Sequence, residues 1–203
     1  TVLLADDVAS AGPNESEKRR GVAGLVYGFK IAGAAAASGV DLAAVTAVTQ
    51  KAADACRSIG VALTPCTVPE VGKPTFDIGE DEIEMGMGIH GEPGIWRGAH
   101  RSANEIAREM LDRVSAELDL KGGDRVSVLV NSLGATPLEE LFILYRTVAK
   151  ILGDQNVKII TPLVGRYATS MEMTGASITV IKLDDELEGL LKAPADCPFW
   201  GHV

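Results

Sequence analysis

The residues best suited to chemistry in this sequence are one histidine and the glycines around it. Four glycines surround His90 in the segment 86–95, which reads GMGIHGEPGI. Glycine has no Cβ, so a small ligand or a neighbouring backbone can approach the main chain closely at Gly88 and Gly91. The neutral imidazole of His90 has a nitrogen lone pair that can attack an electrophilic carbonyl. The segment therefore predicts either a nucleophilic histidine or a loop histidine held by its neighbours.

Several further motifs accompany this segment. Together they resemble the dihydroxyacetone kinase substrate-binding subunit family, whose GIHGEPGI segment matches residues 88–95. Motifs similar to that family, in the same order, are RGVAG at 20–24, KIAGAAA at 30–36, SIGVA at 58–62, CTVP at 66–69, GKPT at 72–75, NSLGATPL at 131–138 and TSMEMTG at 169–175. The resemblance extends over almost the whole chain.

The resemblance implies a role for His90. In that family the corresponding histidine binds the substrate ketone covalently as a hemiaminal. We therefore expect His90 to capture dihydroxyacetone, or a similar short ketose, for phosphorylation of a terminal hydroxyl, with Gly88 and Gly91 beside the substrate. One alternative is a kinase for another short sugar such as erythrulose. Another is a non-catalytic coactivator that senses a ligand through the same capture chemistry.

The resemblance covers only the second, C-terminal domain of the family's two-domain subunit. Residues 1–18 resemble the connection between the domains, and residues 19–203 resemble the second domain. In the family, the first domain supplies an aspartate and a second histidine that act on the hydroxyl, and neither can be assigned here. The resemblance thus implies that the site needs the missing N-terminal domain, and it also implies a homodimer.

The sequence shows no nucleotide-binding motif. Glycines within 86–91 fit the spacing of the dinucleotide fingerprint, but Pro93 and Gly94 follow where that fingerprint requires a helix. Residues 72–74 read GKP and lack the Ser or Thr of a phosphate loop. We expect no cofactor on this chain. The resemblance implies ATP, or ADP rephosphorylated by a phosphotransferase chain, with Mg²⁺ on a nucleotide-binding partner domain or subunit.

Polar residues near the histidine segment have competing interpretations. Glu92 is expected either to accept backbone N–H groups or to set the tautomer of His90. The acidic run before the segment lacks a second set of ligands with metal spacing, so we interpret it as a solvated strand edge rather than a metal site. This run comprises Glu80, Asp81, Glu82 and Glu84.

Residues 131–137 follow a predicted strand and precede a predicted helix, where α/β proteins often bind ligands. They are expected either to line the pocket near His90 or to form a turn in which Thr136 caps the helix and Pro137 occupies its first position. His100 and His202 lack a glycine-rich setting like that of His90 and are expected at the surface.

Composition excludes several classes of function. The net charge of -9 disfavours partners rich in phosphate, so we expect neither nucleic acid nor membrane binding. Apolar runs are shorter than the roughly 20 residues that span a bilayer, and no signal segment is visible. Cys56, Cys66 and Cys197 lack metal-ligand spacing and are interpreted as reduced thiols of a cytoplasmic protein.

The apolar periodicity predicts alternating helices and strands. Helices are expected at 21–37, 41–57, 102–120, 138–152 and 184–191, and strands at 59–63, 75–78, 83–89, 124–130, 157–164 and 175–183. This alternation favours an α/β domain with a mixed sheet packed by helices. The resemblance implies two layers and about six strands. His90 should then lie at or just past the end of a strand.

Overall fold

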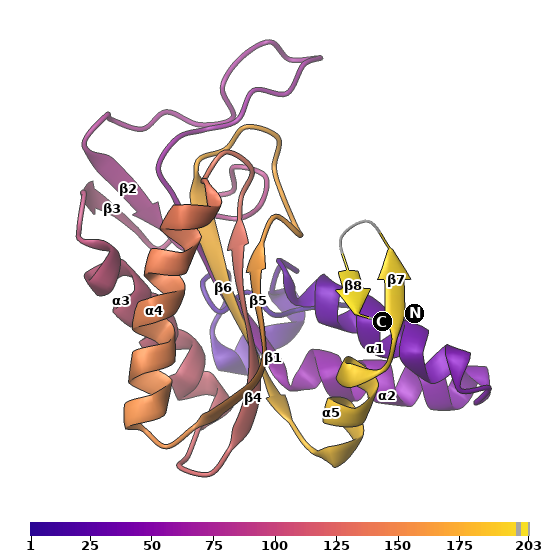
Figure 1. The fold of residues 1–203 in the computed structure, drawn as a ribbon. Coiled ribbons are helices and arrows are strands. Elements are labelled where there is room, and N and C mark those ends of the chain that lie inside the picture. The colour runs from indigo at the N-terminus through magenta and orange to yellow at the C-terminus, as the bar shows by residue number, and fades with distance from the viewer. Residues whose placement is uncertain (198–199, 203) are drawn as a thin grey trace.

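The computed structural model describes residues 1–197 and 200–202, in which helices and strands alternate (Figure 1). The helices are the 3₁₀ helix η1 (Pro13–Lys18), α1 (Gly24–Ala37), α2 (Leu42–Asp54), α3 (Ala103–Leu118), α4 (Leu138–Asp154) and α5 (Asp185–Lys192). The strands are β1 (Cys56–Ala62), β2 (Glu82–Met85), β3 (Trp96–Ala99), β4 (Arg125–Ser132), β5 (Lys158–Gly165), β6 (Gly175–Leu183), β7 (Ala195–Cys197) and β8 (Trp200–His202).

One mixed sheet of six strands organises the molecule. Its strand order is β3-β2-β1-β6-β4-β5. β4 and β5 run parallel, and the other neighbours in the sheet run antiparallel. A parallel pair needs a crossover connection, and α4 supplies it between β4 and β5. β7 and β8 form a separate two-stranded hairpin.

Helices cover both faces of this sheet (Figure 1). α3 and α4 pack on one face through residues such as Met110 and Val148. α1, α2 and α5 pack on the other through residues such as Tyr27 and Leu187. The expectation of an α/β domain on a mixed six-stranded sheet is confirmed. The expectation of two layers is wrong, because the sheet and the helices on its two faces make three layers. β4 and β6 are buried along nearly their whole length, which requires cover on both faces.

The sheet face beneath α1 carries a row of buried polar side chains, here called the polar row. Ser58 Oγ lies 2.7 Å from Thr179 Oγ1, and Tyr27 Oη lies 2.8 Å from Ser127 Oγ. Hydrogen bonding within the row offsets the loss of contact with water. The row comprises Asp6, Tyr27, Ser58, Ser127, Asn131, Ser177 and Thr179.

Part of the segment expected as a connection, residues 1–18, is packed into this domain. Asp6 is fully buried, and its carboxylate accepts hydrogen bonds from the backbone N–H of Val22 at 3.1 Å and of Gly24 at 2.9 Å. These two donors flank Ala23, the N-cap residue of α1, which provides no side-chain cap. Asp6 therefore does for α1 what an N-cap side chain ordinarily does.

The other predicted elements differ from the structure mainly around the histidine segment. The predicted strand at 75–78 is wrong, because these residues belong to an irregular connection between β1 and β2. β2 ends at Met85, earlier than predicted, since Gly86 takes a left-handed conformation with φ of 84°. β3 and the β7–β8 hairpin were not predicted. Asp41 is the N-cap of α2, and its carboxylate accepts from Ala44 N at 2.8 Å.

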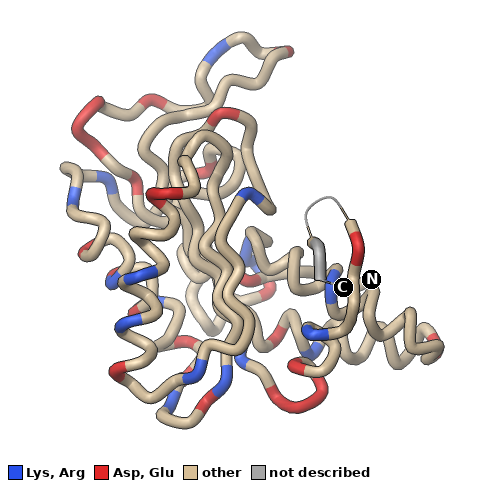
Figure 2. Tube along the Cα trace, in the orientation of Figure 1, with Lys and Arg blue, Asp and Glu red and all other residues tan. Residues whose placement is uncertain are grey.

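Acidic and basic residues are interspersed over the helices and loops (Figure 2). Within the described ranges, no helix has both the length and the apolar character needed to cross a bilayer. The three cysteines are free thiols, two of them buried and Cys197 exposed.

Candidate functional site

Residues 86–95 form a loop, here called the histidine loop, that joins β2 to β3. Its two ends are hydrogen-bonded to the sheet: the backbone N–H of Gly86 donates to Gly60 O at 2.6 Å, and that of Ile95 to Met85 O at 2.7 Å. The N–H of Gly94 donates to the buried carboxylate of Glu84 at 2.7 Å. The sheet therefore fixes the base of the loop while its middle projects outward.

His90 stands in that projecting part, five residues beyond the end of β2 rather than at or just past it. Its side chain is 74% exposed, and its Nδ1 lies 3.1 Å from Glu92 Oε1. The other oxygen of Glu92 accepts the backbone N–H of His90. One carboxylate thus holds both the main chain and the ring of His90, which unites the two roles expected for Glu92.

The charge of Glu92 suits this contact. Partial burial would raise the pKa of Glu92, but hydrogen bonds from the His90 ring and from nearby backbone N–H groups outweigh it, so this pKa lies below its ordinary value. An ionised Glu92 accepts a proton-bearing Nδ1, which leaves the lone pair of the ring on Nε2. Nε2 is then the nucleophilic nitrogen of a largely exposed side chain.

The glycines beside His90 leave room for the protein's own atoms. A Cβ at Gly88 would overlap the Glu92 carboxylate and would lie 2.9 Å from Arg20 Nη1. Gly91 has φ of 91°, and a Cβ there would lie 2.8 Å from the Cβ of Thr75. Both positions therefore require glycine to bring Glu92, Arg20 and Thr75 against the loop.

Arg20 is a residue at this site that sequence reasoning did not single out. Its Nε lies 2.9 Å from Asp7 Oδ2, and its Nη2 donates to the carbonyl oxygen of Gly86 at 3.1 Å. Its Nη1 lies 3.4 Å from the carbonyl oxygen of Pro93. The only signal in the sequence was that Arg20 opens the RGVAG motif, which gives no indication of these partners.

The acidic run before the loop has mixed surroundings. Glu80 and Asp81 are exposed, as expected of a solvated edge. That expectation is wrong for Glu84, which is 6% exposed because it accepts from Gly94 and pairs with Arg97, whose Nε lies 2.9 Å away. Among the residues that the structure describes, no group of three His, Cys, Asp or Glu side chains is placed to hold a metal ion.

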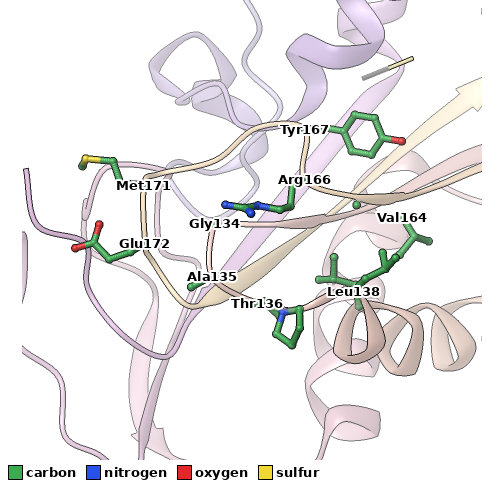
Figure 3. Close-up of a pocket in the computed structure, with 12 residues that line it drawn as sticks. Gly134, Ala135, Thr136, Leu138, Val164, Arg166, Tyr167, Met171 and Glu172 are labelled. Carbon is green, nitrogen blue, oxygen red and sulfur yellow. The ribbon is translucent and has the colours of Figure 1, made fainter. Parts of the chain in front are cut away.

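A separate cavity of about 750 Å³ lies at the carboxyl ends of the parallel strands β4 and β5. Residues 134–138 and 164–167 line it, and His90 is not among its lining residues. Figure 3 shows Met171 and Glu172 at one end of this cavity and Leu138 and Val164 at the other. Residues of the 131–137 segment thus line a cavity that His90 does not share.

The turn interpretation of that segment is wrong in its details. Pro137 is itself the N-cap of α4 and has no side-chain hydrogen bond to the helix. Thr136 instead binds β6, because its Oγ1 accepts from Gly175 N at 2.8 Å and donates to Gly175 O at 2.6 Å.

The remaining two histidines are His100 and His202. His100 is exposed as expected, and its Nε2 lies 3.1 Å from Glu82 O. The side chain of His202 falls outside the part of the chain that the structure describes.

Known proteins resemble this chain over nearly all of its length. The dihydroxyacetone-binding subunit DhaK of PTS-dependent dihydroxyacetone kinase 2 from Listeria innocua is 47% identical over 200 residues, which cover 98% of this chain and 60% of that protein. An L-erythrulose kinase of Pectobacterium atrosepticum is 44% identical over 201 residues, covering 97% of this chain and 34% of the relative. The chain therefore spans between one third and three fifths of the length of these relatives.

The fold has solved counterparts. The structure of the dihydroxyacetone kinase operon co-activator Dha-DhaQ matches with a TM-score of 0.87 and 31% identity, over 95% of this chain and 60% of that chain. The sequence model of the Dak1 domain family matches residues 1–199. This range includes the histidine loop together with Asp7 and Arg20, which support it. The resemblance inferred from the motifs is thus confirmed, and the chain belongs to the Dak1 domain family.

Proposed function

We propose that this chain is the ketone-holding part of a dihydroxyacetone kinase, in which His90 binds the substrate carbon covalently. The observation that carries the proposal is the contact between His90 Nδ1 and Glu92 on an otherwise exposed ring. With Nδ1 bound to Glu92, the lone pair of the neutral ring lies on Nε2. Dak1 family membership and the DhaK relative support dihydroxyacetone, or a similar short ketose, as the ligand.

The capture step follows from that geometry. Nε2 of His90 attacks the carbonyl carbon, a C–N bond forms, and the electron pair of the C=O π bond moves to oxygen. The alkoxide takes up a proton to become a hydroxyl, and the Nδ1 proton is lost through Glu92. The product is a neutral hemiaminal, and the step needs no oxidant or reductant. A reversible covalent bond orients a small sugar that offers little surface for binding.

We further propose that the rest of the active site comes from outside this chain. A preceding N-terminal domain would supply the groups that act on the hydroxyl, with residues 1–18 leading into the second domain formed by 19–203. A partner domain or subunit would carry ATP, or ADP, with Mg²⁺. The exposure of the His90 ring and the lack of a phosphate loop in the sequence support this division. We also propose that the complete protein is a homodimer and is located in the cytoplasm.

Two other functions have an observation in their favour. The L-erythrulose kinase relative is nearly as similar to this chain as the DhaK subunit, so a four-carbon ketose is the second candidate substrate. The match to a co-activator structure favours, as the third candidate, a ligand sensor that captures the ketone without turnover.

The test is covalent capture in the full-length protein. Crystals soaked in dihydroxyacetone should show continuous density from an imidazole nitrogen of His90 to the central carbon of the ligand. Glycerol, which has no carbonyl, should give none. His90→Ala should abolish the mass increase that dihydroxyacetone produces, whereas His100→Ala, at another exposed histidine, should retain it. A ketone lying at van der Waals distance from His90 would refute the covalent model.

A further inference from the structure

Arg20 connects segments that lie far apart in the sequence. Its guanidinium binds Asp7 through Nε at 2.9 Å and through Nη2 at 2.7 Å. The same group donates to the carbonyl oxygens of Gly86 and Pro93, at 3.1 Å and 3.4 Å. Gly86 begins the histidine loop and Pro93 lies near its end. One planar group with several fixed donors therefore holds the two sides of the loop together.

Asp7 fixes this guanidinium from the interior of the domain. The carboxylate is 1% exposed, and its second oxygen accepts from Ala9 N at 2.9 Å. The neighbouring backbone is tied to β1, because Val8 N donates to Ser58 O at 3.0 Å. Burial raises the pKa of Asp7, and the Arg20 guanidinium opposes that rise. The ion pair is thus anchored to the sheet on one side and to the loop on the other.

Arg20 is linked to the imidazole of His90 indirectly, through Gly88 and Glu92. A Cβ at Gly88 would lie 2.9 Å from Arg20 Nη1 and would overlap the carboxylate of Glu92, so Gly88 is packed between the two side chains. Glu92 in turn binds both the ring and the main chain of His90. A displacement of the guanidinium therefore moves the residues that orient the ring.

We propose that Arg20, held by Asp7, is a positioning residue that closes the histidine loop and sets the His90 imidazole for attack on the ligand carbonyl. The proposal rests on the function proposed above for His90. Arg20 acts through the loop rather than on the ligand. A displacement of about 1 Å in a reacting group is enough to slow a reaction roughly 100-fold, so a loosened loop should have a measurable effect.

The neighbouring arginine provides a matched control. Arg19 also forms a two-pronged ion pair, but its partner is Glu117 of α3, with contacts of 2.6 and 2.7 Å, and its side chain is fully buried whereas that of Arg20 is 22% exposed. A lysine in either position keeps the charge and can still pair with one carboxylate. It has a single nitrogen, however, and so cannot bind Asp7 while also reaching the carbonyls of Gly86 and Pro93.

The experiment compares Arg20→Lys, Arg19→Lys and His90→Ala in the full-length protein. Hydrogen exchange of the amides in 86–95 reports on the loop, and the rate of adduct formation with ¹³C-labelled dihydroxyacetone reports on capture. Arg20→Lys should speed exchange in the loop and slow capture by about tenfold or more, and the shift of the imidazole ¹⁵N signals should report the disturbed ring. Arg19→Lys should lower the melting temperature and leave capture within about twofold of the parent.

Each outcome decides the proposal. Unchanged exchange and capture in Arg20→Lys would overturn it, and so would an equal loss of capture in Arg19→Lys, which would indicate a general loss of stability. Slower capture with unchanged loop exchange would also overturn it, because Arg20 would then act on the ligand directly. If His90→Ala still captures the ketone, the proposed function fails, and the role of Arg20 is decided by loop exchange alone.

Discussion

Glu92 controls the chemistry proposed for His90 more directly than any glycine of the loop. Its carboxylate selects the tautomer and balances the positive charge that develops on the ring when Nε2 attacks. These two effects can be separated by changing the charge while keeping the shape.

Glu92→Gln should slow capture of dihydroxyacetone by about 10- to 100-fold, because the amide still accepts a hydrogen bond but no longer balances an imidazolium. The rate of adduct formation followed by NMR measures this. Glu105→Gln is the control, since Glu105 also accepts a backbone hydrogen bond, from Ser102 N, but does so at the start of α3. Equal rates for Glu92→Gln and the parent would show that the negative charge has no role.

Acid should release the histidine loop only at low pH. Because hydrogen bonds lower the folded-state pKa of Glu92 below its ordinary value of 4.5, their contribution is fully present above that value and is lost as the pH falls through the lowered pKa. Exchange of the His90 amide should therefore be insensitive to this carboxylate between about pH 5 and 8, after correction for intrinsic rates. A loop transition near neutral pH that Glu92→Gln removes would contradict this.

Sequence reasoning reaches some of these residues and not others, for reasons of distance along the chain. His90 and Glu92 stand two residues apart, so their contact could be anticipated. The partners of Arg20 lie 13, 66 and 73 residues away, and only the folded chain brings them together. The burial of Glu84 was also hidden, because its partners Gly94 and Arg97 lie 10 and 13 residues away, and the fold of the histidine loop brings them back to it.

At the scale of elements, the start of α1 depends on a residue outside the helix. Asp6 accepts from two backbone N–H groups there and also binds Ser58 of β1. The side chain therefore couples the helix to the centre of the sheet.

Asp6→Ala should lower the free energy of unfolding by about 2–4 kcal/mol, because it leaves buried donors without an acceptor. Asp41→Ala, which removes the exposed cap of α2, should lower it by about 1 kcal/mol. Urea denaturation of both variants measures the difference. Similar losses for the two would show that the burial of Asp6 adds nothing to an ordinary helix cap.

The long elements were predictable because their apolar periodicity is strong. β6 spans the predicted residues, and α3 begins after Ser102, which forms a capping box with Glu105. β3 was missed because it is four residues long, lies at the edge of the sheet and alternates only between partly buried and exposed positions. The third layer was missed because α1 packs with small residues, whose spacing does not indicate which face of the sheet they cover.

At the scale of the whole molecule, the proposed reaction is divided between this chain and other parts. The chain by itself should show no steady phosphorylation of dihydroxyacetone with ATP and Mg²⁺, because the His90 ring is open to solvent and the sequence has no phosphate loop. A coupled assay for ADP measures this, with the chain added to the complete enzyme as a check for inhibition. Sustained turnover by the purified chain would contradict the proposed division.

The polar row described under α1 has a consequence for misfolding. A slip of one residue between antiparallel strands turns every inward side chain to the opposite face. For β1 and β6, such a slip would separate Ser58 from Thr179 and would place hydroxyl groups among the apolar side chains of α3 and α4. Each unsatisfied buried group destabilises a misaligned sheet by roughly 1–3 kcal/mol. A slip leaves several such groups unsatisfied at once, so the polar row favours the native alignment of the strands.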